Sequence, residues 1–189
     1  MQVPFHWRSA GVDGGDVKRI DTHCLDVIEE EAATAHPPDI IVILCGINDL
    51  KNYVGNPFKN IGPRKFRSRL LGLIQKIKQV APNAKVVVPS FPTQMFHRKS
   101  PLNIFPLNFF LDSVIAYWDH QKKLVADAYP TEIFYFEMNP SEIFEWFEFE
   151  DKEHCNDSTL LAADGVHPNA KCYASWANSL GSKIFNKLS

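Results

Sequence analysis

Asp164 and His167 lie three residues apart near the end of this sequence, and Pro168 and Asn169 follow them directly. A carboxylate close to an imidazole holds one ring tautomer and stabilises the imidazolium that forms when the other nitrogen takes a proton. The pair therefore fits general-base catalysis. The alternative interpretation, which an isolated pair of this kind favours, is that Asp164 caps a helix and His167 is an ordinary surface histidine. A second signal elsewhere in the sequence is needed to decide between them.

Asn48 provides that second signal, in the segment Gly-Ile-Asn-Asp at 46–49, which follows an apolar run over 39–45. Ligands of open α/β sheets bind at the carboxyl ends of the strands. A side-chain amide at that edge can donate a hydrogen bond to a ligand, or it can cap its own loop, and the segment alone favours neither role.

A glycine-rich turn over residues 11–15 leads into the first predicted helix. Glycine allows positive φ and lets backbone N–H groups approach a ligand closely. One interpretation is a flavodoxin-like phosphate site at the N-terminus of that helix. The sequence contains neither GxGxxG nor GxxxxGK[ST], so this interpretation has little support.

The elements that position these residues alternate between strands and helices. The β-branched run at 39–45 is typical of a strand buried on both faces of a parallel sheet. Residues 90–108 are rich in proline and aromatic side chains, and we expect them to form a wall or lid over an apolar site. Further strands are predicted at 3–9, 84–89 and 132–137, helices at 17–35, 63–81, 109–129 and 170–188, and a polar loop at 51–62.

This alternation predicts one α/β domain over residues 1–189, a three-layer α/β/α sandwich around a flavodoxin-like parallel sheet. The 189 residues are 45% hydrophobic with a formal net charge of −2, so no basic excess indicates a nucleic-acid partner. No apolar run approaches the roughly 18 residues of a membrane span. The cysteines show neither a CxxC pair nor metal-finger spacing, and we expect no metal or cofactor: Cys24, Cys45, Cys155 and Cys172. The compartment stays open.

Together the segments around Asn48 and His167, in this order on this pattern, resemble the SGNH hydrolases, the GDSL-type esterases and lipases. The turn at Gly14 and Gly15 is similar to the glycine block that precedes the asparagine in that family. The resemblance covers essentially the whole chain. It implies the three-layer fold and an acyl-transfer reaction on a small-molecule ester.

The resemblance also implies a role for each matching residue. Asp164 would orient His167, and His167 would deprotonate a serine nucleophile. The Asn48 side chain and the backbone N–H of Gly15 would donate to the tetrahedral oxyanion, with Gly14 as the alternative because the extra glycine shifts the register by one. A donor of this kind typically contributes ~10²–10³ in rate.

One part of the family pattern is missing. The family carries its nucleophile in a Gly-Asp-Ser motif at the end of its first strand, and no such motif precedes the glycine turn here. Ser9, Ser90 and Ser100 lack that context, so no nucleophile is identified. We expect the family's first strand to be absent, through truncation or natural loss, and the sheet edge that it would cover to pair with another copy or with a rearranged N-terminus.

The sequence therefore predicts an ester hydrolase that works through a Ser-His-Asp mechanism, inactive in this chain if the serine is missing. The alternative is a hydrolase-like binding module that keeps Asp164, His167 and Asn48 and performs no turnover.

Overall fold

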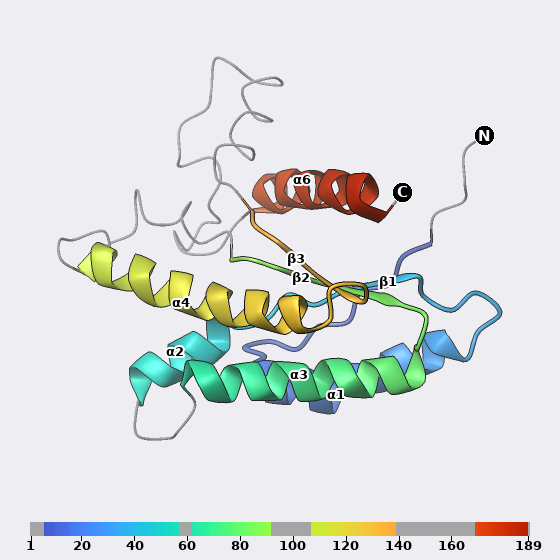
Figure 1. Cartoon of the computed structure of the whole chain (residues 1–189), viewed down its shortest axis with the longest axis horizontal. Coiled ribbons are helices and arrows are strands. Elements are labelled where there is room, and N and C mark those ends of the chain that lie inside the picture. The colour runs from blue at the N-terminus through green and yellow to red at the C-terminus, as the bar shows by residue number, and fades with distance from the viewer. Residues whose placement is uncertain (1–5, 57–61, 92–106, 139–168, 189) are drawn as a thin grey trace, which may run out of the picture. The chain divides into compact units, whose positions relative to one another are not determined.

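The computed structural model describes residues 6–56, 62–91, 107–138 and 169–188. Three strands form a parallel sheet in the order β1-β2-β3: β1 (Ile40–Val42), β2 (Lys85–Pro89) and β3 (Ile133–Phe136). Helices alternate with these strands along the chain, so the predicted α/β class is confirmed (Figure 1). The chain divides into two compact units, Met1–Val86 and Val87–Ser189, which are described in turn. The extension of one domain over the whole chain stays a prediction.

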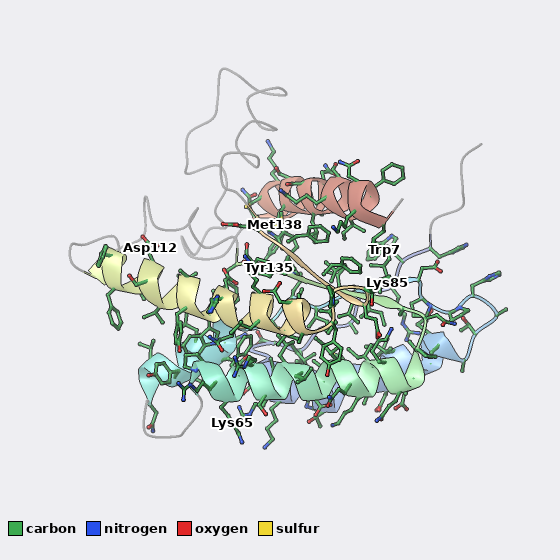
Figure 2. The ribbon with its side chains drawn as sticks, viewed as in Figure 1. Trp7, Lys65, Lys85, Asp112, Tyr135 and Met138 are labelled. Carbon is green, nitrogen blue, oxygen red and sulfur yellow. The ribbon has the colours of Figure 1, made fainter. Side chains whose placement is uncertain are left out.

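The first unit is built on a pair of helices, α1 (Val17–Ala32) and α3 (Pro63–Val80), which lie side by side (Figure 1). In α3 the apolar residues recur every three or four positions, which places them on one face. Those that are buried are Phe66, Leu70, Leu73, Ile74 and Ile77. Lys65, labelled in Figure 2, is exposed. An ion pair from Lys76 Nζ to Asp21 Oδ2, at 2.7 Å, joins the two helices at their surface.

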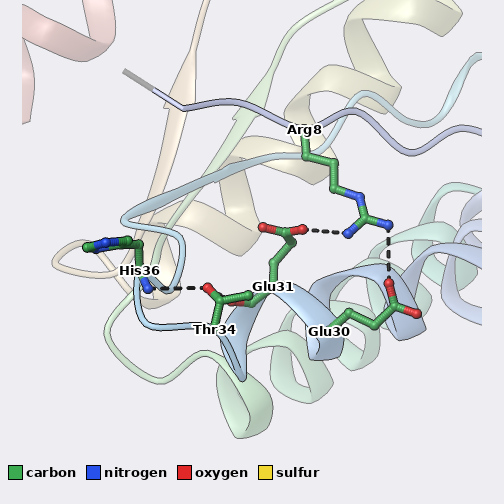
Figure 3. A network of polar contacts seen from close by, with 5 residues as sticks. All are labelled: Arg8, Glu30, Glu31, Thr34 and His36. Atoms are coloured by element: carbon green, nitrogen blue, oxygen red, sulfur yellow. Dashed lines mark hydrogen bonds and ion pairs between the residues drawn. The ribbon is translucent and has the colours of Figure 1, made fainter. Parts of the chain in front are cut away.

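The segment that precedes the glycine turn is fastened to the C-terminal end of α1 (Figure 3). The Arg8 guanidinium donates to the carboxylates of Glu30 and Glu31. Just beyond the helix, the Thr34 hydroxyl donates to the Glu31 carbonyl at 2.8 Å and accepts from the His36 N–H at 3.3 Å. These contacts are exposed to solvent, so they fix the path of the segment and add little stability.

Three predictions about the first unit are wrong. The run at 39–45 is not buried on both faces: Ile40 and Val42 are 39% and 41% exposed, because the face of β1 on which their side chains lie is open to solvent, although Ile43 and Cys45 are buried. The described part of 3–9, from residue 6 onward, forms no strand. The first part of the polar loop predicted at 51–62 belongs instead to a helix, α2 (Ile47–Gly55). Apolar residues recur in this segment every three or four positions, the spacing typical of a helix.

The second unit contains α4 (Leu107–Ala128) and α6 (Ala170–Leu188). One face of α6 packs on the sheet residues of this unit, in a core made by Val87, Met138, Cys172, Trp176 and Leu180, with Phe134, Phe136 and Ile184 at its border. Figure 2 labels Met138, which lies just beyond β3. The helix and strand bounds in this unit agree with the predicted ones to within two residues. The wall predicted at 90–108 falls largely outside the described residues.

Candidate functional site

The glycine turn of the first unit is closed by a hydrogen bond from the Gly15 N–H to the Val12 carbonyl, at 3.0 Å. Gly14 occupies the third position of this turn with φ +60°, a conformation that glycine adopts without a steric penalty. A Cβ on Gly15 would lie 2.5 Å from Val12 Cγ1 and 2.9 Å from the Val12 carbonyl oxygen. Both glycines are therefore required by the shape of the turn itself.

The turn leads directly into α1. Asp16 is the N-cap, and its Oδ1 accepts a hydrogen bond from the Arg19 N–H at 2.9 Å. This is the arrangement expected of an acidic N-cap, which satisfies one of the four N–H groups that have no partner within the helix. The turn and the start of α1 therefore behave as one rigid junction.

Asn48 enters the site from the first turn of α2. Gly46 is the N-cap of that helix and has φ +109°, a left-handed conformation, and the Leu50 N–H donates to the Gly46 carbonyl at 2.9 Å. Because a positive φ carries no steric penalty for glycine, glycine is favoured at position 46. The result is that Asn48 stands at the carboxyl end of β1, the edge where the sequence predicted a ligand site.

The structure brings Asn48 and the glycine turn together. The half-buried Asn48 amide donates from Nδ2 to the Gly15 carbonyl at 3.1 Å, across 33 residues of sequence. An amide nitrogen carries two protons, so one donor position of Asn48 remains for a second acceptor. Among the described residues, the Gly14 N–H has no hydrogen-bond partner, whereas the Gly15 N–H is bonded to Val12.

Asp49 is a site residue that the sequence analysis did not assign. Its side chain is 2% exposed, and Oδ2 accepts a hydrogen bond from the Val17 N–H at 3.0 Å. Burial raises the pKa of this carboxyl to about 6, with a further increase from the negative charge of Asp16; the Val17 hydrogen bond and the Arg69 guanidinium act in the opposite direction. The feature of the sequence that could have identified Asp49 is its position directly after Asn48 in the Gly-Ile-Asn-Asp segment.

Asp164 and His167 lie outside the described residues. Immediately after them, Asn169 caps α6: its Oδ1 accepts from the Cys172 N–H at 3.0 Å. The last helix therefore begins where the sequence predicted, directly after the segment that carries the acid and the base.

The three serines considered as nucleophiles differ in their surroundings. Ser90, at the end of β2, is 6% exposed, and its Oγ accepts from the Met138 N–H at 2.8 Å and is hydrogen-bonded to Tyr135 (Tyr135 and Met138 are labelled in Figure 2). This hydroxyl is part of the packing of the second unit. Ser9 is exposed on a segment without regular structure, and Ser100 lies outside the described residues.

A buried ion pair borders Ser90. The Lys122 side chain is 1% exposed, and its Nζ lies 3.1 Å from Asp119 Oδ1, donates to the Pro89 carbonyl at 3.0 Å and sits 3.4 Å above the centre of the Phe91 ring. The Phe91 N–H donates to both Asp119 oxygens. Every charged atom of the pair therefore has a partner, which marks it as a structural device that holds the end of β2 against α4.

In the part of the chain that the structure describes, no group of three or more His, Cys, Asp or Glu side chains could hold a metal ion. Within the same residues, no helix is both long enough and apolar enough to cross a membrane.

Comparison with known proteins agrees with this picture. The sequence profile of the GDSL-like lipase/acylhydrolase family matches residues 2–174. A structure described as a GDSL-like lipase from Parabacteroides merdae superposes with a TM-score of 0.53 at 18% identity, covering 89% of this chain and 69% of the other. A Clostridium thermocellum family 3 carbohydrate esterase gives 0.56 at 18% identity, covering 93% and 67%. At this identity the two structures establish a shared fold. No curated protein sequence matches the chain significantly.

Proposed function

Since this chain belongs to the GDSL-like lipase/acylhydrolase family, we propose that it cleaves acyl esters by transfer of the acyl group to a hydroxyl nucleophile. The observation that carries the proposal is the contact between Asn48 and the glycine turn. In the proposal, the Asn48 amide and the backbone of the glycine turn supply the hydrogen-bond donors that a tetrahedral oxyanion requires.

In the proposed reaction, Asp164 holds the imidazole of His167 in one tautomer, and the free ring nitrogen takes the proton of the attacking hydroxyl. The same proton then passes to the leaving alcohol. The second Nδ2 proton of Asn48 donates to the oxyanion. Because the Gly15 N–H already serves Val12, the geometry supports Gly14, rather than Gly15, as the source of the backbone donor.

The proposed substrate is an ester with a small or medium acyl group on a sugar or lipid alcohol. One structural neighbour is named a lipase and the other a carbohydrate esterase, so both names refer to proteins that act on esters. The chemistry assigned to Asp164, His167 and Asn48 requires neither a metal nor a cofactor.

A second function is favoured by one observation: Ser90, the serine at the end of a described strand, is engaged in packing. A chain with an acid, a base and oxyanion donors but no activated hydroxyl would bind esters without hydrolysing them. This hydrolase-like binding module is the alternative to the enzyme.

A fluorophosphonate separates the two functions, because it reacts only with an activated serine. For the enzyme we expect one adduct per chain by intact mass, located by peptide mapping, and its loss in the His167→Ala variant. His120→Ala, which changes an exposed histidine on α4, should keep the adduct. A folded protein that forms no adduct would contradict the enzymatic proposal and support the binding module.

A further inference from the structure

The N-terminus of α1 is held by a residue from another helix. The first N–H groups of a helix have no partner within it. At α1, the Arg19 N–H is satisfied by the N-cap, Asp16, whereas the Val17 N–H donates to the buried carboxylate of Asp49 on α2, at 3.0 Å. The start of α1 is therefore bonded to the start of α2.

A second contact runs beside this one. Asn48 Nδ2 donates to the Gly15 carbonyl at 3.1 Å, so two consecutive residues of α2 bind two positions on either side of Asp16. A single hydrogen bond leaves the partners free to rotate about it. Two bonds from adjacent residues fix both the distance and the orientation of the glycine turn relative to Asn48.

We propose that Asp49 is a positioning residue for the oxyanion donors: its bond to the Val17 N–H holds the glycine turn in register with the Asn48 amide. This inference rests on the proposed function, in which Asn48 and the turn stabilise the oxyanion. Asp49 touches no reacting atom and acts through the geometry of its neighbours. Small displacements matter here, because a misplacement of about 1 Å can lower a rate ~10²-fold.

The contact depends on pH. The charged groups near Asp49 are Asp16 at the N-cap of α1 and Arg69 on α3. Burial, with a smaller contribution from the negative charge of Asp16, outweighs the Val17 hydrogen bond and the Arg69 guanidinium, so the pKa of the carboxyl rises to about 6. A carboxylate is a stronger acceptor than a carboxylic acid. The bond to the Val17 N–H is therefore tighter above the pKa and looser below it.

Nuclear magnetic resonance of the full chain tests the contact without any need for turnover. In the wild type, the Val17 backbone amide and the Asn48 side-chain amide should titrate together with a midpoint near the pKa of about 6. Asp49→Asn keeps an acceptor and removes the proton equilibrium, so both resonances should keep near-native positions and lose the titration. Asp26→Ala, an exposed carboxylate on α1, should leave the titration unchanged.

Kinetics with p-nitrophenyl acetate tests the positioning role. Asp49→Ala should lower kcat roughly 10- to 100-fold with little change in KM, and Asp49→Asn should restore most of kcat. If Asp49→Ala keeps full kcat, or if the Val17 amide does not titrate in the wild type, the inference is wrong. If neither the wild type nor any variant hydrolyses the ester, while the two amides of the wild type titrate together, the proposed function fails and the Asp49 contact stands.

Discussion

Asn48 uses one of its two amide protons to hold the Gly15 carbonyl, and this makes its role testable at the level of a single side chain. If the other proton stabilises an oxyanion, Asn48→Ala should lower kcat by ~10²–10³, with fold and KM nearly unchanged. Steady-state hydrolysis of p-nitrophenyl acetate measures this. Asn52→Ala, an exposed asparagine on the same helix, is the matched control and should retain the wild-type kcat. Equal losses in the two variants would mean that α2 is merely destabilised.

Asp49 makes stability depend on pH, because its pKa is about 6 in the fold and about 3.9 in an unfolded chain. The folded protein therefore binds this proton more tightly, and the free energy of unfolding falls as the pH rises from about 4 through about 6. The loss amounts to roughly 3 kcal/mol, since one unit of pKa corresponds to about 1.4 kcal/mol. Urea unfolding at several pH values should show that Asp49→Asn lacks this component of the pH dependence. An identical dependence in the variant would exclude Asp49 as its source.

At the scale of elements, the glycine turn and α3 each contain a glycine, one with atoms close to where a Cβ would lie and one with open space there. Gly15→Ala should destabilise the protein by about 1–3 kcal/mol, because the new Cβ would collide with Val12 and overpacking of this kind has that cost. Gly72→Ala should instead stabilise it by up to about 1 kcal/mol, since no atom lies within 4 Å of the added Cβ and alanine is the better helix former. Thermal unfolding of the two variants gives the comparison, and changes of the same sign would contradict the described turn.

The packing of the end of β2 against α4 depends on the buried Lys122–Asp119 pair. Lys122→Met would leave a buried carboxylate without its cation, and breaking one partner of a buried pair typically costs about 3–5 kcal/mol. Removing Lys122 would also raise the pKa of Asp119 further, because this cation now opposes the effect of burial on that carboxyl. Lys123→Met, at the exposed neighbouring position, should change stability by less than about 0.5 kcal/mol. If denaturant unfolding of Lys122→Met shows only a small loss in the free energy of unfolding, water must reach the Asp119 carboxylate in the variant.

At the scale of the whole molecule, β1 is the edge strand of the described sheet. Ile40 and Val42 are exposed on this strand, and no strand of the described part of the chain pairs with its outer edge. An unpaired strand edge promotes association with another chain. We therefore expect the protein to self-associate through this edge. Light scattering should give a mass above that of one chain for the wild type, and Val42→Lys should shift it to the monomer. Val54→Lys, which changes an exposed valine of α2, should not. A monodisperse wild-type monomer would contradict self-association.

Much of the element order could be predicted from local patterns. The helices at 63–80 and 170–188 show apolar residues at helical spacing, and the turn at 12–15 is specified by its glycines. These features depend on side chains a few positions apart, which a sequence displays directly. Family membership was accessible for the same reason, because the segments around Asn48 and His167 are short and contiguous.

The tertiary structure alone decided which distant groups meet. The Asn48–Gly15 and Asp49–Val17 bonds join residues more than thirty positions apart, and the burial of Asp49 follows from how α1, α2 and their loops pack. The exposure of Ile40 and Val42 likewise depends on what packs over their face of β1, although their β-branched side chains suit a buried strand equally well. A sequence pattern specifies the face on which a side chain lies, whereas packing specifies what that face contacts.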